Sequence, residues 1–255
     1  MAKQLLDEPF AIAGKRALVT GSAHRIGRCI ALRLAREGAQ LAIHYSTSSA
    51  EAEATAAECT KLSGLPSLLL QSRLDRVADI AEMFASIESS WNGLDVLVNN
   101  AARFTRRNVF EVTESDWDEV HAVNLKAAFF CAQHAARLMR KIAVPGRIVN
   151  MSSLGGLQAW AEHVHYNASK AGVIHMTRAL AKALAPDITV NSVAPGFIPF
   201  DERDYSQTNE GPVALTPVKR PGRPEEIADA VLFFIRSANY VTGQTLAVDG
   251  GLSIR

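Results

Sequence analysis

The chain has 255 residues, of which 48% are hydrophobic, so it can bury a full core in one large α/β domain or in two small ones. Its 27 basic and 26 acidic side chains nearly cancel, which gives no electrostatic reason to expect a nucleic acid or an anionic membrane as a partner. The three cysteines lack the paired spacing of a disulfide framework, and no apolar run reaches about 18 residues, so we expect one cytoplasmic domain over residues 1–255 that binds a small molecule.

From Arg16 onward, short apolar runs rich in β-branched residues alternate with longer segments of helical period. This alternation predicts strand–helix–strand units and a parallel sheet. Strands are expected at 17–20, 40–45, 68–71, 94–98, 147–151 and 188–193. The clearest helices are expected at 26–37, after a glycine turn, at 116–141 and at 224–236. The predicted fold class is therefore α/β, a single doubly wound parallel-sheet domain with helices on both faces.

The turn after the first strand reads Thr20-Gly21-Ser22-Ala23-His24-Arg25-Ile26-Gly27. A glycine turn at this place lets the backbone approach a pyrophosphate, whose negative charge is favoured by the helix N-terminus. The turn resembles the Thr-Gly-x-x-x-Gly-x-Gly motif of the short-chain dehydrogenase/reductase family, which has a Rossmann fold. Arg25 replaces the middle glycine, as in the pteridine reductase branch, where the arginine also reaches the substrate. The resemblance implies cofactor contacts from Gly21, His24, Arg25, Ile26 and Gly27.

The strand at 40–45 is not followed by the carboxylate that an NAD-preferring site usually offers to the ribose 2′-hydroxyl. The hydroxyls of Ser46 and Thr47 could bind a 2′-phosphate instead, with positive charge from His24 and Arg25. We therefore predict NADP(H), with NAD(H) less favoured. By the same resemblance, Leu74 after the third strand is expected to contact the cofactor.

Two later turns also resemble the family. Asn99-Asn100-Ala101-Ala102 follows the fourth strand and differs from the family's Asn-Asn-Ala-Gly only at its last residue. Pro195-Gly196-Phe197-Ile198 follows the sixth strand and matches the Pro-Gly turn that contacts nicotinamide, ahead of an expected substrate loop at about 197–217. The implied cofactor contacts are Asn100, Ala101, Ala102, Pro195, Gly196 and Ile198.

Tyr166 and Lys170 lie four residues apart in an apolar helical pattern, which places the phenol and the ammonium on one helix face. A nearby cation can lower the tyrosine pKa of about 10 by roughly 1 to 3 units, nearer the pH at which proton transfer is efficient. The resemblance implies that Tyr166 is the catalytic acid/base and that Lys170 also binds the nicotinamide ribose. It further implies that Ser153 orients the substrate oxygen and that Asn124 holds a water linking the lysine to solvent.

These residues predict an NADP(H)-dependent oxidoreductase that transfers a hydride between nicotinamide and a carbonyl or alcohol. Its substrate pocket is expected to include Arg25, Phe104, Ser153 and Tyr166. Phe104 lies where pteridine reductases stack the pterin, although it could equally be one apolar wall of another pocket. His163 and His165 are expected at the pocket mouth, and no metal is predicted, because no third ligand is evident.

Three alternatives stay open. Arg25 and Phe104 favour a pteridine reductase, whereas Ser153 stands where that branch usually has an aspartate that protonates a ring nitrogen. A serine favours ketone chemistry instead, as in 3-oxoacyl-carrier-protein reductases. The third alternative, of another class, is a non-catalytic NADP(H)-sensing protein. The resemblance covers about 16–251 and implies a homotetramer.

Overall fold

The computed structural model describes residues 10–199 and 212–254. Seven parallel strands form one sheet in the order β3-β2-β1-β4-β5-β6-β7, which confirms the predicted fold class. The second and third predicted strands agree with the structure to the residue, and the others agree within a few residues. The strands are β1 (Arg16–Val19), β2 (Gln40–Tyr45), β3 (Leu68–Gln71), β4 (Val96–Asn99), β5 (Gly146–Met151), β6 (Ile188–Pro195) and β7 (Thr245–Val248).

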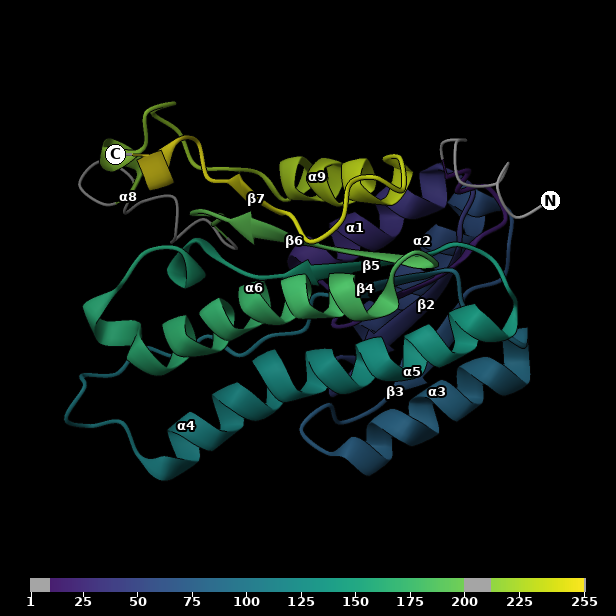
Figure 1. Ribbon diagram of the computed structural model, residues 1–255, viewed down its shortest axis with the longest axis horizontal. Coiled ribbons are helices and arrows are strands. Elements are labelled where there is room, and N and C mark those ends of the chain that lie inside the picture. The colour runs from purple at the N-terminus through teal and green to yellow at the C-terminus, as the bar shows by residue number, and fades with distance from the viewer. Residues whose placement is uncertain (1–9, 200–211, 255) are drawn as a thin grey trace.

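Helices cover both faces of the sheet (Figure 1). On one face lie α1 (Arg25–Arg36), α2 (Ser49–Ser63) and α9 (Pro224–Arg236), and on the other lie α3 (Val77–Trp91), α5 (Ala127–Lys141) and α6 (Val164–Leu184). Successive strand residues point to opposite faces, so Val19 packs with the first group and Leu18 with the second. Because both faces are buried, the strands are apolar runs rather than alternating ones.

The predicted helix at 116–141 is interrupted in the structure. It begins at 114, since Thr113 and Asp116 form a capping box, and α4 (Glu114–His121) passes through a π-helical turn (Ala122–Lys126) into α5. Single π-turns inside helices occur frequently at functional sites. This turn contains Asn124, one of the predicted catalytic residues.

Short helices complete the described chain: Leu154–Gly156, Ala161–His163, α8 (Pro212–Leu215) and Leu252–Ile254. The predicted substrate loop at about 197–217 lies largely outside the described residues. Among the helices in the described ranges, none has the length and apolarity needed to traverse a bilayer. The loops that follow the strands meet at the carboxyl edge of the sheet, where ligands bind in folds of this kind.

Candidate active site

Ser153, Tyr166 and Lys170 meet at the carboxyl edge of the sheet. Ser153 follows β5, while Tyr166 and Lys170 lie one turn apart on α6, as predicted. The Lys170 ammonium is 5.9 Å from the centre of the Tyr166 ring, and Ser153 is hydrogen-bonded to the Tyr166 phenol. All three side chains are buried, with exposed fractions of 8% or less. A protonated phenol, a hydroxyl and a cation thus share one water-poor site.

The predicted effect of Lys170 on the tyrosine is not observed. The pKa of Tyr166 is raised above its ordinary value, because burial disfavours the phenolate, and the hydrogen bond with Ser153 offsets this only in part. Lys170 instead donates to the carbonyl oxygen of Met151 at 2.8 Å. Tyr166 is therefore a protonated acid at neutral pH, which suits proton donation to a carbonyl oxygen.

Burial also acts on Lys170, whose pKa is lowered to about 8 because the charged ammonium is removed from water. The residue is 3% exposed. At pH 7 most molecules still carry the ammonium charge. A modest rise in pH removes that charge, so this part of the site is sensitive to pH just above neutrality.

Asn124 connects two sides of the site. Its Oδ1 accepts from the Arg103 N–H at 2.8 Å, and its Nδ2 donates to the Arg103 carbonyl oxygen at 3.0 Å. Nδ2 also lies 3.1 Å from the Ser169 hydroxyl on α6. The asparagine therefore holds the loop after β4 against α6, which explains a residue type that is mildly unfavourable in helix interiors.

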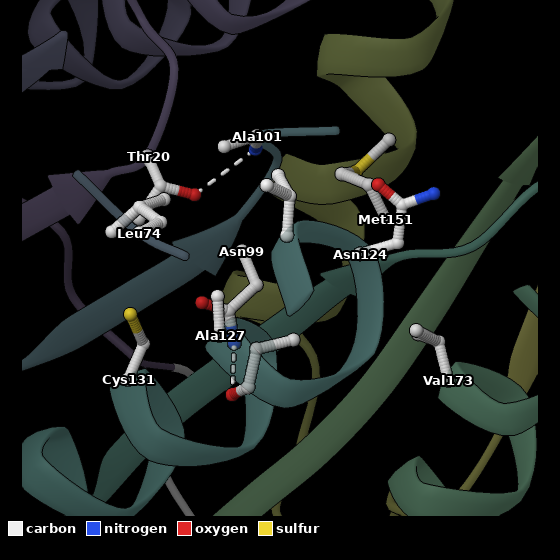
Figure 2. A pocket seen from close by; sticks show the side chains of 11 residues that line it. Thr20, Leu74, Asn99, Ala101, Asn124, Ala127, Cys131, Met151 and Val173 are labelled. Carbon is white, nitrogen blue, oxygen red and sulfur yellow. Dashed lines mark hydrogen bonds between the residues drawn. The ribbon is translucent and has the colours of Figure 1, made fainter. Parts of the chain in front are cut away.

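A small cavity lies beside Asn124 (Figure 2). Its volume is about 10 Å³, close to what one water molecule needs. Thr20, Leu74, Asn99 and Met151 are among the residues that line it. Leu74, predicted to contact the cofactor, is 7% exposed and packs in the core under the edge of the sheet.

Apart from Tyr166 and Lys170 on α6, the predicted cofactor residues follow the strands at the same edge of the sheet, in loops, in the first turn of α1 and at the end of β6. They are the turn into α1 (Gly21, His24, Arg25, Ile26, Gly27), the loops after β2 (Ser46, Thr47), β3 (Leu74) and β4 (Asn100, Ala101, Ala102), and the end of β6 with its loop (Pro195, Gly196, Ile198).

The glycine turn is held tightly in place. Gly21 has a left-handed φ of 64°, and a Cβ added to Gly27 would lie 2.2 Å from the Gly21 carbonyl oxygen. Asn100 Nδ2 donates to the carbonyl oxygens of Thr20 and Gly21, and Thr20 Oγ1 accepts from the N–H groups of Asn100 and Ala101. Asn100 and Ala101 therefore brace the turn.

The start of α1 fits an anionic group. Within the described part of the chain, His24 at its N-cap makes no side-chain capping hydrogen bond, and the first turn of α1 has no acidic residue. The N–H groups and the positive end of the helix dipole are thus not neutralised by a carboxylate. A phosphate is the group that such a terminus binds.

Arg25 has a left-handed φ of 54° in the place of the family's middle glycine. A non-glycine residue in this region costs about 1 to 2 kcal/mol. We expect Arg25→Gly to raise the free energy of unfolding by about 1 kcal/mol. We also expect it to weaken binding of NADPH, the cofactor predicted from the sequence, because the turn loses a cation. Thermal unfolding and NADPH titration measure the two effects. Arg25→Lys, with its charge and strain retained, should match the wild type, and a loss of stability in Arg25→Gly would contradict this account.

Ser46 and Thr47 are exposed and lie between the end of β2 and Ser48, the N-cap of α2. At the other end of the site, the Gly196 N–H donates to the Val248 carbonyl oxygen at 3.0 Å, and a Cβ on Gly196 would lie 2.6 Å from Asp249 Cα. Glycine is required there because β6 and the end of β7 approach closely. Ile198 is 7% exposed and packs beneath this loop.

Aromatic side chains surround Tyr166. The Phe104 ring lies edge-on to the Tyr166 ring, with 4.8 Å between the ring centres, and it stacks on the His163 ring at 4.7 Å. The Trp160 ring lies edge-on to the His163 ring, with 5.7 Å between their centres. Phe104 is 59% exposed, so this wall faces outward. His163 belongs to this aromatic group, whereas His165, predicted beside it at the pocket mouth, is buried with Nε2 at 2.7 Å from Thr105 Oγ1. Among the described residues, no group of histidine, cysteine and acidic side chains is arranged to hold a metal ion.

Two residues of this edge were not predicted from the sequence. Trp160 lies six residues before Tyr166 and carries no motif signal. His44 Nδ1 accepts from the Gly21 N–H at 2.9 Å. The available signal for His44 was a polar residue within the otherwise apolar run of β2.

Comparisons with known proteins agree with this geometry. Residues 21–253 match the sequence profile of the family described as enoyl-(acyl carrier protein) reductase. The 3-oxoacyl-[acyl-carrier-protein] reductase FabG of Staphylococcus aureus is 40% identical over 244 residues, which cover 93% of this chain and 98% of that protein.

Two solved structures have the same fold over nearly their whole length. A double mutant of a short-chain dehydrogenase/reductase from Serratia marcescens has a TM-score of 0.89 at 33% identity, covering 95% of this chain and 99% of that one. The landomycin C-6 ketoreductase LanV, solved with bound NADP and rabelomycin, has a TM-score of 0.85 at 31% identity, covering 97% of this chain and 100% of that one.

Proposed function

This chain belongs to the short-chain dehydrogenase/reductase family, and on that premise we propose that it is an NADP(H)-dependent ketone reductase whose substrates are 3-oxoacyl thioesters. The observation that carries the proposal is the buried group of Ser153, Tyr166 and Lys170 at the carboxyl edge of the sheet. Asn124 braces this group from the π-helical turn. The same group argues against a non-catalytic NADP(H)-sensing role, because a sensor has no need of a buried proton donor.

Each residue has a definite task in ketone reduction. Bound NADPH supplies the hydride that adds to the carbonyl carbon. Tyr166 Oη gives its proton to the carbonyl oxygen, and Ser153, hydrogen-bonded to Tyr166, stabilises the charge that develops on that oxygen. Lys170, whose ammonium lies 5.9 Å from the centre of the Tyr166 ring, is proposed to bind the nicotinamide ribose, as the family resemblance implies.

NADP(H) is the proposed cofactor. The turn into α1 offers unneutralised N–H groups and Arg25, and the loop after β2 offers the Ser46 and Thr47 hydroxyls in place of a carboxylate. These groups suit a 2′-phosphate better than a ribose 2′-hydroxyl. The bound NADP of LanV, a structural relative, supports this choice.

Ketone chemistry is favoured by Ser153, and the thioester class by the FabG relative from Staphylococcus aureus. A second candidate is reduction of a pterin or another flat heterocycle. The aromatic wall of Phe104, His163 and Trp160 favours it, because stacked rings bind a planar group well. Arg25, which stands in place of the family's middle glycine, also favours this second candidate.

Oxidation of NADPH by the purified protein separates these candidates. We expect turnover with short 3-oxoacyl thioesters and little turnover with dihydropterin or biopterin. We also expect a clear preference for NADPH over NADH. Turnover with pterins alone would replace the first candidate by the second. Binding of NADPH without turnover on either panel would favour the sensor.

By family resemblance we also propose a homotetramer, which light scattering at micromolar concentration tests.

The pH dependence of the reaction should reflect the protonation of Lys170. Its ammonium is present below a pKa of about 8 and is lost as pH rises through that value. We expect kcat/KM for ketone reduction to be level up to about pH 7.5 and then to fall about tenfold per pH unit. A profile measured from pH 6 to 10 checks this, because a limb set by Tyr166 alone would begin above pH 10. A level profile up to pH 10 would contradict the role of Lys170.

A further inference from the structure

His44 is a buried imidazole whose two ring nitrogens both have backbone partners. The Gly21 N–H donates to Nδ1 at 2.9 Å, and Nε2 lies 3.2 Å from the Ser72 carbonyl oxygen. Because a backbone N–H only donates and a carbonyl only accepts, Nδ1 is unprotonated and Nε2 carries the proton. Burial lowers the pKa of His44 to about 4, although the bond to Ser72 raises it. The ring is therefore a neutral connector in one fixed tautomer at neutral pH.

The His44 ring and the backbone of His44 and Tyr45 connect two loops to the end of β2. The Ser22 N–H donates to the His44 carbonyl oxygen at 3.0 Å, and the His44 N–H donates to Ser22 Oγ at 3.2 Å. The Ser72 N–H donates to the Tyr45 carbonyl oxygen at 3.0 Å. The turn after β1 and the loop after β3 are thus both fixed relative to the end of β2.

Gly21 is held from two sides. Asn100 Nδ2 donates to its carbonyl oxygen at 3.0 Å, while His44 accepts from its N–H. A Cβ at Gly21 would lie 3.0 Å from Ala101 Cα, so the turn has little room to shift toward that side. Without His44, the partly buried Gly21 N–H and the carbonyl oxygen of the buried Ser72 would both lose their hydrogen-bond partners. Such a loss costs free energy, and local movement of the loops would relieve it.

We propose that His44 is a positioning residue for the adenosine phosphate half of NADP(H). It sets the spacing of the turn before α1 and the loops after β2 and β3, and so controls cofactor affinity. The inference rests on the proposed function for the identity of the cofactor. His44 acts through Gly21 and Ser72, and it has no part in proton transfer at Tyr166.

Direct titration of the full-length protein with NADPH and with adenosine 2′,5′-bisphosphate tests the proposal. In His44→Leu both hydrogen bonds are lost, and we expect both ligands to bind at least about tenfold more weakly. The kcat at saturating NADPH should stay within about threefold of the wild type. His44→Asn places Oδ1 near the position of Nδ1 and keeps the bond to Gly21, so it should restore affinity to within about threefold.

The control is Ile43→Val. Ile43 precedes His44, and its side chain packs on the α1 face of the sheet, away from the His44 ring. It should lower the thermal midpoint and leave both affinities unchanged. If His44→Leu does not fold, His44→Gln replaces it, since its amide reaches toward Ser72 but not Gly21. The positioning role would be overturned if His44→Leu or His44→Gln bound both ligands with wild-type affinity. It would also be overturned if His44→Asn bound them as weakly as His44→Leu. A wild-type protein that binds neither ligand would overturn the proposed function instead.

Discussion

Tyr166→Phe is expected to lower kcat/KM for ketone reduction by about 100-fold to 10,000-fold, the usual range for loss of a general acid. The phenylalanine ring keeps its place between Phe104 and Trp160, whose ring centres lie 4.8 and 6.4 Å from that of Tyr166. The pocket and the cofactor turn should therefore be undisturbed, and the Kd for NADPH should change by less than about threefold. Steady-state kinetics and NADPH titration measure the two quantities separately.

The matched control for that variant is Tyr240→Phe, because Tyr240 is fully exposed and lies outside the site. It should be indistinguishable from the wild type. If Tyr166→Phe kept more than about a tenth of the wild-type kcat/KM, the phenol could not be the proton donor. A large loss of NADPH affinity would mean instead that the phenol contributes mainly to binding.

Gly27→Ala is expected to have the second large effect. The added Cβ would lie 2.2 Å from the Gly21 carbonyl oxygen and 2.6 Å from Asn100 Nδ2, and the first of these atoms is backbone and cannot rotate away. The start of α1 must move away from the turn, which should weaken NADPH binding by more than about tenfold. Such overpacking typically costs about 1 to 3 kcal/mol of stability. NADPH titration and denaturant unfolding measure the two effects.

Gly172→Ala is the matched control, since it also places alanine inside a helix. Its Cβ would meet Leu125 Cδ2 at 2.9 Å, the far end of a flexible side chain. Alanine is favoured over glycine in a helix interior by about 0.5 to 1 kcal/mol, so stability and NADPH affinity should stay near the wild type. Unchanged NADPH binding in Gly27→Ala would show that the turn before α1 is not the phosphate site.

The sheet could be predicted from the sequence because parallel strands buried on both faces are apolar runs. β2 and β3 begin and end where the pattern indicates. The π-helical turn at Asn124 could not be predicted in this way. The turn lies where Asn124 binds the backbone of Arg103, 21 residues away in sequence. The hydrophobic periodicity of a helix does not indicate such a contact.

The positions of the proposed catalytic residues could be predicted from spacing, whereas their electrostatics could not. The pair Tyr166 and Lys170 follows from helical geometry, but the pKa of Tyr166 depends on burial by surrounding elements, which opposes the expected lowering. His44 was missed for a similar reason. Its partners Gly21 and Ser72 lie 23 and 28 residues away, and only the paired strands bring them to one ring.

Hydride transfer to a ketone is the central claim, and NADPH deuterated at both C4 positions tests it most directly. The wild-type protein is incubated with this NADPH and a short 3-oxoacyl thioester, and the product is examined by mass spectrometry. We predict a 3-hydroxyacyl thioester with one deuterium on the former carbonyl carbon, formed at a rate that falls sharply in Tyr166→Phe. Oxidised cofactor without a labelled hydroxy product, or no product at all, would contradict the assignment.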